Sequence, residues 1–177
     1  WVPVPPSTFA ALAGATVIAN LSASNVVIGK HEYRQELASN QSARCIAAYL
    51  FSAAGAGEST TDLAWDGHAM IWENGTLLGE SRRFADQPQL TISDVDLERL
   101  TADRMRQNSF GMSVRRHASE VQRFRSVEFS LPLPRGRLVL ERRVARFPYV
   151  PDNPATRDVR CEEVYRIQVQ GLATRMR

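Results

Sequence analysis

Lysine is nearly absent from this 177-residue chain, which has 21 arginines but a single lysine, Lys30. No neighbouring lysine can substitute for that side chain. Long apolar runs are also missing, because the longest nearly apolar stretch, Phe9 to Leu21, has only 13 residues. A membrane-spanning helix needs roughly 20. No export signal is visible either, so we expect a cytoplasmic chain without a membrane partner.

Cysteine and histidine are scarce, with two and three copies. Cys45 and Cys161 are more than a hundred residues apart and have neither metal-ligand spacing nor a dense disulfide pattern, which is typical of a reducing compartment. Cys45 lies within a small-residue helical pattern, which favours a buried packing residue over a nucleophile. His31, His68 and His117 are scattered, so we interpret each as a surface or capping residue and predict no metal site.

Charge is distributed unevenly along the chain. Residues 1–90 carry 5 basic and 8 acidic side chains, whereas residues 91–177 carry 17 basic and 11 acidic ones. A basic half is one feature of nucleic-acid binding. Here acidic residues are mixed through it and no aromatic-rich basic motif appears, so we expect no nucleic-acid partner. A non-catalytic basic binding module stays open as an alternative.

The first half of the sequence predicts an α/β fold. Residues 15–21 are rich in β-branched side chains and predict a buried strand. After a polar loop at 22–29, residues 30–49 follow a helical pattern whose inner face includes Leu37, Ala38, Gln41 and Cys45. Residues 49–54 predict the next strand. Small residues on the helical face indicate that the helix packs closely on a sheet.

A β-hairpin is the clearest local prediction. Residues 68–73 and 76–80 flank Asn74-Gly75, a dipeptide favoured in two-residue turns because both positions tolerate positive φ. Further strands are predicted at 90–95 and 123–131, with a charged helix at 96–106.

Proline punctuates the chain after residue 131, at Pro132, Pro134, Pro148, Pro151 and Pro154. This pattern predicts a linker, followed by a helix at 157–176. We therefore divide the sequence into a domain at 1–134 and a linker with a connecting helix at 135–177.

Lys30 is the main candidate for a binding residue. It follows Gly29 at a predicted helix start, where a cation meets the positive end of the helix dipole at a cost of about 0.3–1 kcal/mol. A bound anion would compensate, since helix-start N–H groups and an ammonium form an anion cradle. The loop that follows the carboxyl end of the preceding predicted strand carries Ser22, Ser24 and Asn25. Ligands of α/β sheets bind at that end of the strands. A solvated lysine beside a polar turn is the alternative.

No complete catalytic constellation is present in the sequence. Gly55-Ala56-Gly57 lacks the lysine and hydroxyl residue of a phosphate loop, so it predicts a turn. Asp62 and Asp66 are too far apart on an extended segment to form an acid pair. Both cysteines are poor nucleophile candidates.

Several blocks nevertheless resemble the amidase domain of bacterial glutamine-dependent NAD⁺ synthetases, which belongs to the nitrilase superfamily. The resemblance covers most of the chain and implies part of an α-β-β-α sandwich, followed by a linker and helix. It also runs through the charged helix near Asp96. The other matching blocks are Trp1 to Ser7, Gly14 to Ser24, Gly29-Lys30, Ser39 to Tyr49, Gly57 to Gly67, Arg146 to Pro151 and Tyr165 to Leu172.

The resemblance implies an enzyme that hydrolyses glutamine with a Glu, a Lys and a Cys, and passes ammonia to an ATP- and Mg²⁺-dependent synthetase domain. That domain amidates nicotinic acid adenine dinucleotide to NAD⁺. Trp1 corresponds to a tryptophan that follows the nucleophile, so the three catalytic residues are expected before residue 1 and the chain alone is expected to be inactive. Cys45 and Lys30 do not match them.

The family's glutamine pocket matches Ser24 and Lys30. The resemblance also implies a homo-oligomer, and no cofactor is expected within this chain itself. A standalone nitrilase-type amidase is the alternative enzyme.

Overall fold

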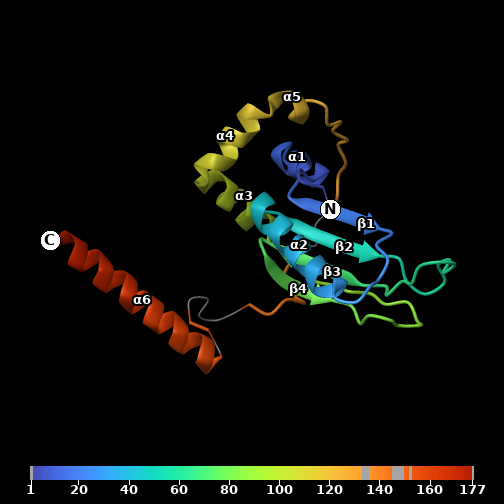
Figure 1. Ribbon diagram of the computed structural model, residues 1–177. Helices are drawn as coiled ribbons and strands as arrows, with labels where there is room; N and C mark the ends of the chain where they lie inside the picture. Colours follow the sequence, from blue (N-terminus) through green and yellow to red (C-terminus); the bar gives the residue numbers. More distant parts are fainter. Residues whose placement is uncertain (1, 133–135, 145–149, 152, 177) are drawn as a thin grey trace. The chain divides into compact units, whose positions relative to one another are not determined.

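Figure 1 shows a computed structural model that describes residues 2–132, 136–144, 150–151 and 153–176. Contacts divide the chain into two units, Trp1–Arg142 and Arg143–Arg177. No helix among the described residues combines the length and apolar character that crossing a membrane requires. Trp1, Pro134, Pro148 and most of the block from Arg146 to Pro151 lie outside the described residues.

A four-stranded sheet forms the centre of the first unit, with its strands in the order β1-β2-β3-β4. The first two strands are parallel, and the other two pairings are antiparallel. A helix connects the parallel pair, as parallel strands require a crossover. The strands are β1 (Val17–Ser22), β2 (Ala48–Ala53), β3 (Ala69–Glu73) and β4 (Thr76–Glu80).

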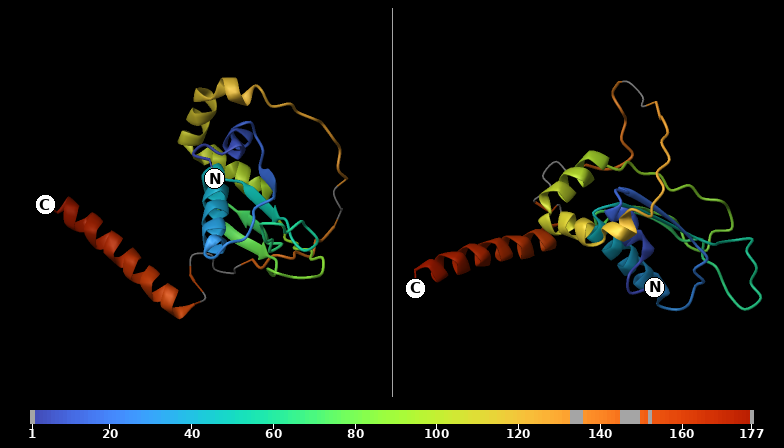
Figure 2. Two further views of the ribbon diagram at one scale, coloured as in Figure 1. Left: turned by 45° about the vertical axis from the view of Figure 1, so that its right-hand side comes forward. Right: turned by 90° about the horizontal axis from the view of Figure 1, so that it is seen from above.

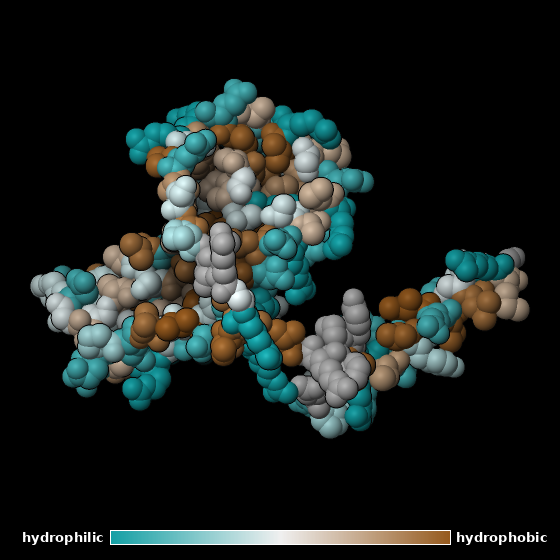
Figure 3. Space-filling view, turned by 180° about the vertical axis from the view of Figure 1, so that it is seen from behind, coloured by the Kyte–Doolittle hydropathy of each residue, from teal (hydrophilic) through white to brown (hydrophobic). Residues whose placement is uncertain are grey.

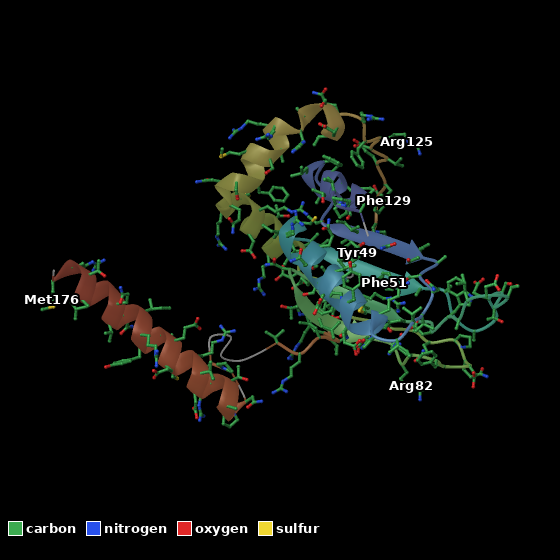
Figure 4. The ribbon with its side chains drawn as sticks, in the orientation of Figure 1. Tyr49, Phe51, Arg82, Arg125, Phe129 and Met176 are labelled. Carbon is green, nitrogen blue, oxygen red and sulfur yellow. The ribbon has the colours of Figure 1, made fainter. Side chains whose placement is uncertain are left out.

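Helices contact both faces of this sheet, which confirms the predicted α/β fold. On one face Ala38 of α2 packs with Tyr49 and Phe51 of β2, and Figure 4 shows those two side chains. On the other face Leu100 of α3 packs with Ala48. Alternate residues of β2 thus pack against helices on opposite faces of the sheet. The helices of this unit are α1 (Pro6–Leu12), α2 (Lys30–Cys45), α3 (Leu97–Arg106), α4 (Asn108–Arg116) and α5 (Ala118–Val121). Figure 1 labels them, and Figure 2 shows the ribbon in two further views.

Helix α2 ends four residues before the predicted end. Ile46 adopts a left-handed conformation with φ of 46°. Its N–H donates to the Ala43 carbonyl oxygen, and the Ala47 N–H donates to the Ser42 carbonyl oxygen, each at 3.1 Å. This cap ends the helix, so Tyr49 is a strand residue. The predicted face was also partly wrong, because Leu37 is 38% exposed whereas Arg34 is buried.

Strand β1 forms where a strand was predicted, but two residues later at its start. It lies at the edge of the sheet and its residues alternate between exposed and half-buried. The expectation of a buried strand was therefore wrong for this chain, because among the described residues only β2 pairs with it. Leu21, near its end, is 87% exposed.

The hairpin prediction is confirmed. Asn74 and Gly75 have φ of 46° and 80°, so both turn positions are left-handed. The turn also approaches α2, because a Cβ added to Gly75 would lie 3.1 Å from the Cβ of Ala43. Glycine is thus favoured there by both conformation and space.

The strands predicted at 90–95 and 123–131 are absent, since neither segment pairs with a strand in the described part of the chain. Helix α3 is confirmed, and its N-cap residue Asp96 accepts a hydrogen bond from the Arg99 N–H at 2.9 Å. Helices α4 and α5 were not predicted. Phe110 of α4 packs beside the cluster that contains Leu100.

The second unit contains α6 (Pro154–Arg175), which confirms the predicted C-terminal helix and begins three residues earlier. The Asn153 side chain accepts a hydrogen bond from the Ala155 N–H at 3.0 Å, and Pro154 occupies the first turn. None of its described residues is buried, and Figure 3 shows hydrophobic side chains on its surface. The division at residues 134 and 135 stays a prediction.

Candidate functional site

A cavity of about 560 Å³ lies beside α2, β1, β2 and residues 2–5. Its size is typical of small-molecule sites. Tyr49 and Phe51 contribute aromatic surface, while Asn20 and Ser24 contribute polar groups. The Asn20 amide donates a hydrogen bond to the Tyr49 hydroxyl at 2.9 Å, which fixes both polar groups in the wall.

Within the described part of the chain, the charged residues that line this cavity are two cations, Arg34 and Arg44. Burial raises the pKa of the Tyr49 hydroxyl, although the hydrogen bond from Asn20 partly opposes that rise. The phenol therefore stays neutral near pH 7. A wall with two guanidinium groups and neutral hydroxyl and amide groups suits an anionic or zwitterionic ligand.

Ser24, a predicted binding residue, lines the cavity and is only 6% exposed. One guanidinium nitrogen of Arg34, Nη2, donates to the Ser24 carbonyl oxygen at 3.3 Å and to its Oγ at 3.4 Å. The sequence prediction did not include Arg34. The overlooked signal is its place four residues before Ala38, on the same helical face.

Lys30, the other predicted binding residue, is the first residue of α2 and follows Gly29, whose φ is 76°. Its Nζ donates to Asn25 Oδ1 at 2.8 Å. Lys30 thus contacts the same loop that carries Ser24. Lys30 is not among the described residues that line the cavity. The binding roles of Ser24 and Lys30 stay predictions.

A buried ionic cluster adjoins the cavity behind Ser24. Nη1 of Arg34 donates to Asp66 Oδ1 and Oδ2 at 3.1 and 3.0 Å, and Nε of Arg83 donates to Asp66 Oδ2 at 2.9 Å. Burial alone would raise the pKa of Asp66, but the two guanidinium groups outweigh it and lower that pKa. Asp66 is therefore a buried carboxylate with two cationic partners.

His68 is fully buried in this cluster, so its interpretation as a surface or capping residue was wrong. Its Nδ1 lies 3.2 Å from Arg34 Nη1, and its Nε2 lies 2.7 Å from Glu80 Oε1. Because Arg34 can only donate, Nδ1 accepts, and Nε2 carries the proton toward Glu80. Burial lowers the pKa of His68 more than Glu80 raises it.

His31 joins His68 and Glu80 in a group with metal-ligand atoms within 4.8 Å of one another. Metal binding at Nε2 of His68 would move its proton to Nδ1, which faces Arg34. The geometry therefore favours a hydrogen-bonded cluster over a metal site. The sequence spacing did not predict that the two histidines meet. His117, by contrast, lies at the junction of α4 and α5, as a capping residue does.

Cys45 is buried, and burial raises the pKa of its thiol. The Gln41 amide donates to its sulfur at 3.2 Å. These contacts confirm the prediction of a packing residue, because a protonated, enclosed thiol is a poor nucleophile. Cys161 is exposed on α6.

No protein-family model matches the chain. Three similar curated proteins are all described as glutamine-dependent NAD(+) synthetase. The one from Mycobacterium leprae is 54% identical over all 177 residues, and those from Mycobacterium bovis and Mycobacterium tuberculosis H37Rv are 52% identical over the same length. The chain spans 26% of the length of each relative.

Two solved structures resemble parts of the chain. A glutamine-dependent NAD(+) synthetase from Cytophaga hutchinsonii matches 46% of the chain and 14% of its own length, with a TM-score of 0.43 and 27% identity. A carbon-nitrogen hydrolase from Helicobacter pylori G27 matches 61% of the chain and 41% of its own length, with a TM-score of 0.45 and 15% identity.

Proposed function

We propose that this chain is a segment of a glutamine-dependent NAD⁺ synthetase and contributes part of the nitrilase-like domain that hydrolyses glutamine. The observation that carries this proposal is the 52–54% identity with three such synthetases over all 177 residues. A standalone amidase and a basic binding module are not favoured, because these matches over all 177 residues of the chain are to synthetases.

In this proposal the segment supplies a wall of the glutamine pocket. Glutamine is a zwitterion, so it must exchange water for fixed polar partners when it binds. The cavity beside Ser24 has such partners, and Lys30 contacts the loop that carries Ser24 through Asn25. A charge-assisted hydrogen bond from Lys30 to the α-carboxylate would contribute about 1.5–3 kcal/mol.

The nucleophile of this proposal is a cysteine other than the two in this chain. Cys45 is enclosed and protonated, and Cys161 lies on α6 in the second unit. The attacking thiolate, its Glu base and its oxyanion-stabilising Lys are thus assigned to the part of the enzyme that this segment does not cover. Attack of that thiolate on the glutamine side-chain amide would form a thioester and expel ammonia, and water would then hydrolyse the thioester to glutamate and the free thiol.

The ammonia is proposed to pass to the synthetase domain of the same protein. That domain would bind ATP and Mg²⁺ and amidate nicotinic acid adenine dinucleotide. No cofactor is assigned to the segment itself. A homo-oligomeric assembly is part of the same proposal.

The test replaces Lys30 in the full-length protein that carries this segment. We expect Lys30→Ala to raise the glutamine KM roughly 10- to 100-fold, the equivalent of one charge-assisted hydrogen bond. NAD⁺ synthesis from ammonium chloride should hardly change, because that route bypasses the pocket. Lys30→Arg is the matched control and should stay near the wild-type KM, since it keeps a cation. Equal loss of the glutamine-driven and ammonia-driven rates would make Lys30 a structural residue.

A further inference from the structure

Arg34 connects three parts of the first unit through one side chain. The side chain projects from α2. Its Nη2 donates to Ser24, and its Nη1 donates to Asp66 and to Nδ1 of His68. The residue is only 2% exposed but still lines the cavity. Its guanidinium carbon lies 5.4 Å from the centre of the Phe51 ring, which adds a cation–π contact from the sheet.

The position requires the forked shape of arginine. The two terminal nitrogens point to different partners, one to the Ser24 loop and one to the buried carboxylate. A lysine ammonium is a compact point charge and cannot span both. Charge alone therefore does not account for Arg34, since a lysine would neutralise Asp66 equally well.

Asp66 in turn is held by contacts of its own. Arg83 donates to its carboxylate, and its carbonyl oxygen accepts a hydrogen bond from the Phe84 N–H at 2.8 Å. The next residue, Gly67, runs so close to Gly55 that a Cβ on Gly55 would lie 2.9 Å from the Gly67 Cα. The carboxylate thus has a fixed place from which to orient Arg34.

The loop that carries Ser24 depends on this arrangement. Residues 23–27 have no regular secondary structure. The loop is tied to the segment before β3 by the Val26 N–H, which donates to the Ala64 carbonyl oxygen at 2.9 Å, and by Arg34 between Ser24 and Asp66. Arg34 contacts Ser24 itself, at both its carbonyl and hydroxyl oxygens.

We infer that Arg34 is a positioning residue of the pocket, which orients the Ser24 hydroxyl and carbonyl for the amino-acid substrate from its anchor on Asp66. This inference rests on the proposed glutamine site. It adds a role for a residue that acts through Ser24 and need not touch the substrate. The buried Asp66 carboxylate and His68 then act on the pocket through their contacts with Arg34.

The experiment measures glutamine-driven and ammonia-driven synthesis by the full-length protein. We expect Arg34→Lys to raise the glutamine KM about tenfold, the loss of a single oriented hydrogen bond, with the kcat of the ammonia-driven reaction within twofold of wild type. Arg82→Lys is the matched control, because Arg82 is an exposed arginine beside the cluster and, among the described residues, its side chain makes no hydrogen bond or ion pair with Asp66 or Ser24. Its KM should stay within twofold of wild type.

A double-mutant cycle with Ser24→Ala separates positioning from general damage. If Arg34 acts through Ser24, Arg34→Lys should raise the KM clearly less in the Ser24→Ala protein than in the wild type, because coupled residues are not additive. Full additivity would overturn the inference. Asp66→Glu keeps every charge but displaces the anchor, so it provides a second variant if Arg34→Lys does not fold. It too should raise the glutamine KM while sparing the ammonia-driven rate.

The four variants together distinguish failure of the positioning role from failure of the proposed pocket. If Lys30→Ala and Ser24→Ala raise the KM but Arg34→Lys and Asp66→Glu do not, the positioning role is wrong and the pocket stands. If none of the four changes the glutamine KM, the proposed pocket itself is wrong.

Discussion

The two units of this chain are stabilised in different ways. Trp1–Arg142 has apolar clusters on both faces of its sheet and a buried cluster of charged side chains far apart in the sequence. In Arg143–Arg177, α6 has no buried described residue. It is supported by its N-cap and by neighbours along the helix, such as the 2.6 Å ion pair of Glu162 with Arg166. The comparison separates structure built on distant contacts from structure built on local ones.

The energetic consequence is an asymmetry in what one substitution can do. Removing one partner of a buried ion pair leaves an uncompensated charge and typically costs several kcal/mol. Exposed helical pairs contribute a few tenths of a kcal/mol. We therefore expect large effects in the first unit and small, local ones in the second.

Asp66→Asn should give the largest effect. It removes the carboxylate between Arg34 and Arg83 and leaves the buried Arg34 cation unpaired, so we expect the free energy of unfolding to fall by about 3–5 kcal/mol. Chemical denaturation of the full-length protein measures this. Asp103→Asn is the matched control, because its partners Arg99 and Arg106 have side chains 62% and 77% exposed. A loss of stability below about 1 kcal/mol for Asp66→Asn lies in the range of surface ion pairs. It would contradict the expectation that substitutions in the buried cluster of the first unit have large effects.

Arg104→Met should rank second. The Arg104 side chain donates to the carbonyl oxygens of four residues, which lie in the last turn of α1, in the segment after it, and at the end of α2: Ala11, Ala15, Cys45 and Ile46. Methionine keeps much of the volume but no donor, so we expect a loss of about 1.5–3 kcal/mol. Thermal unfolding provides the measurement. Arg106→Met, at an exposed position, serves as control and should stay within about 0.5 kcal/mol of wild type.

Gly171→Ala should have the smallest effect and the opposite sign. Gly171 lies inside α6, and an added Cβ would meet no atom within 4 Å. Alanine should stabilise the helix by up to about 1 kcal/mol, which slows local amide exchange roughly fivefold. Hydrogen–deuterium exchange should show slower α6 amides. Gly111→Ala, in an equally open position of α4, should leave α6 exchange unchanged. If Gly171→Ala left α6 exchange unaltered, the stability of α6 would not depend on interactions within the helix.

The contrast between local and distant contacts also explains which features could be predicted from the sequence. Asn74-Gly75 predicts the hairpin and Asp96 predicts the start of α3, because each depends on residues within one turn. The C-terminal helix was predicted for the same reason. The end of α2 was missed, since the left-handed Ile46 cap interrupts an otherwise continuous helical pattern.

The site was predicted only in part. Ser24 lines the cavity as a binding residue should, and its role still awaits a test. Asp66 and His68 could not be identified, because their burial depends on Arg34, more than 30 residues away. Polar residues that pair across such separations have no periodic signal in a single sequence. For the same reason the strands predicted at 90–95 and 123–131 failed, since strand formation requires a neighbour.

Strand β1 has a practical consequence for anyone who wishes to express this segment separately. Only β2 pairs with it among the described residues, and Val17 and Leu21 on it are 44% and 87% exposed. A strand edge of this kind is a template on which another molecule's strand can add. Purified segments would therefore tend toward edge-to-edge aggregation. Natural proteins suppress such pairing with a charged edge residue, and a lysine at position 21 would supply one.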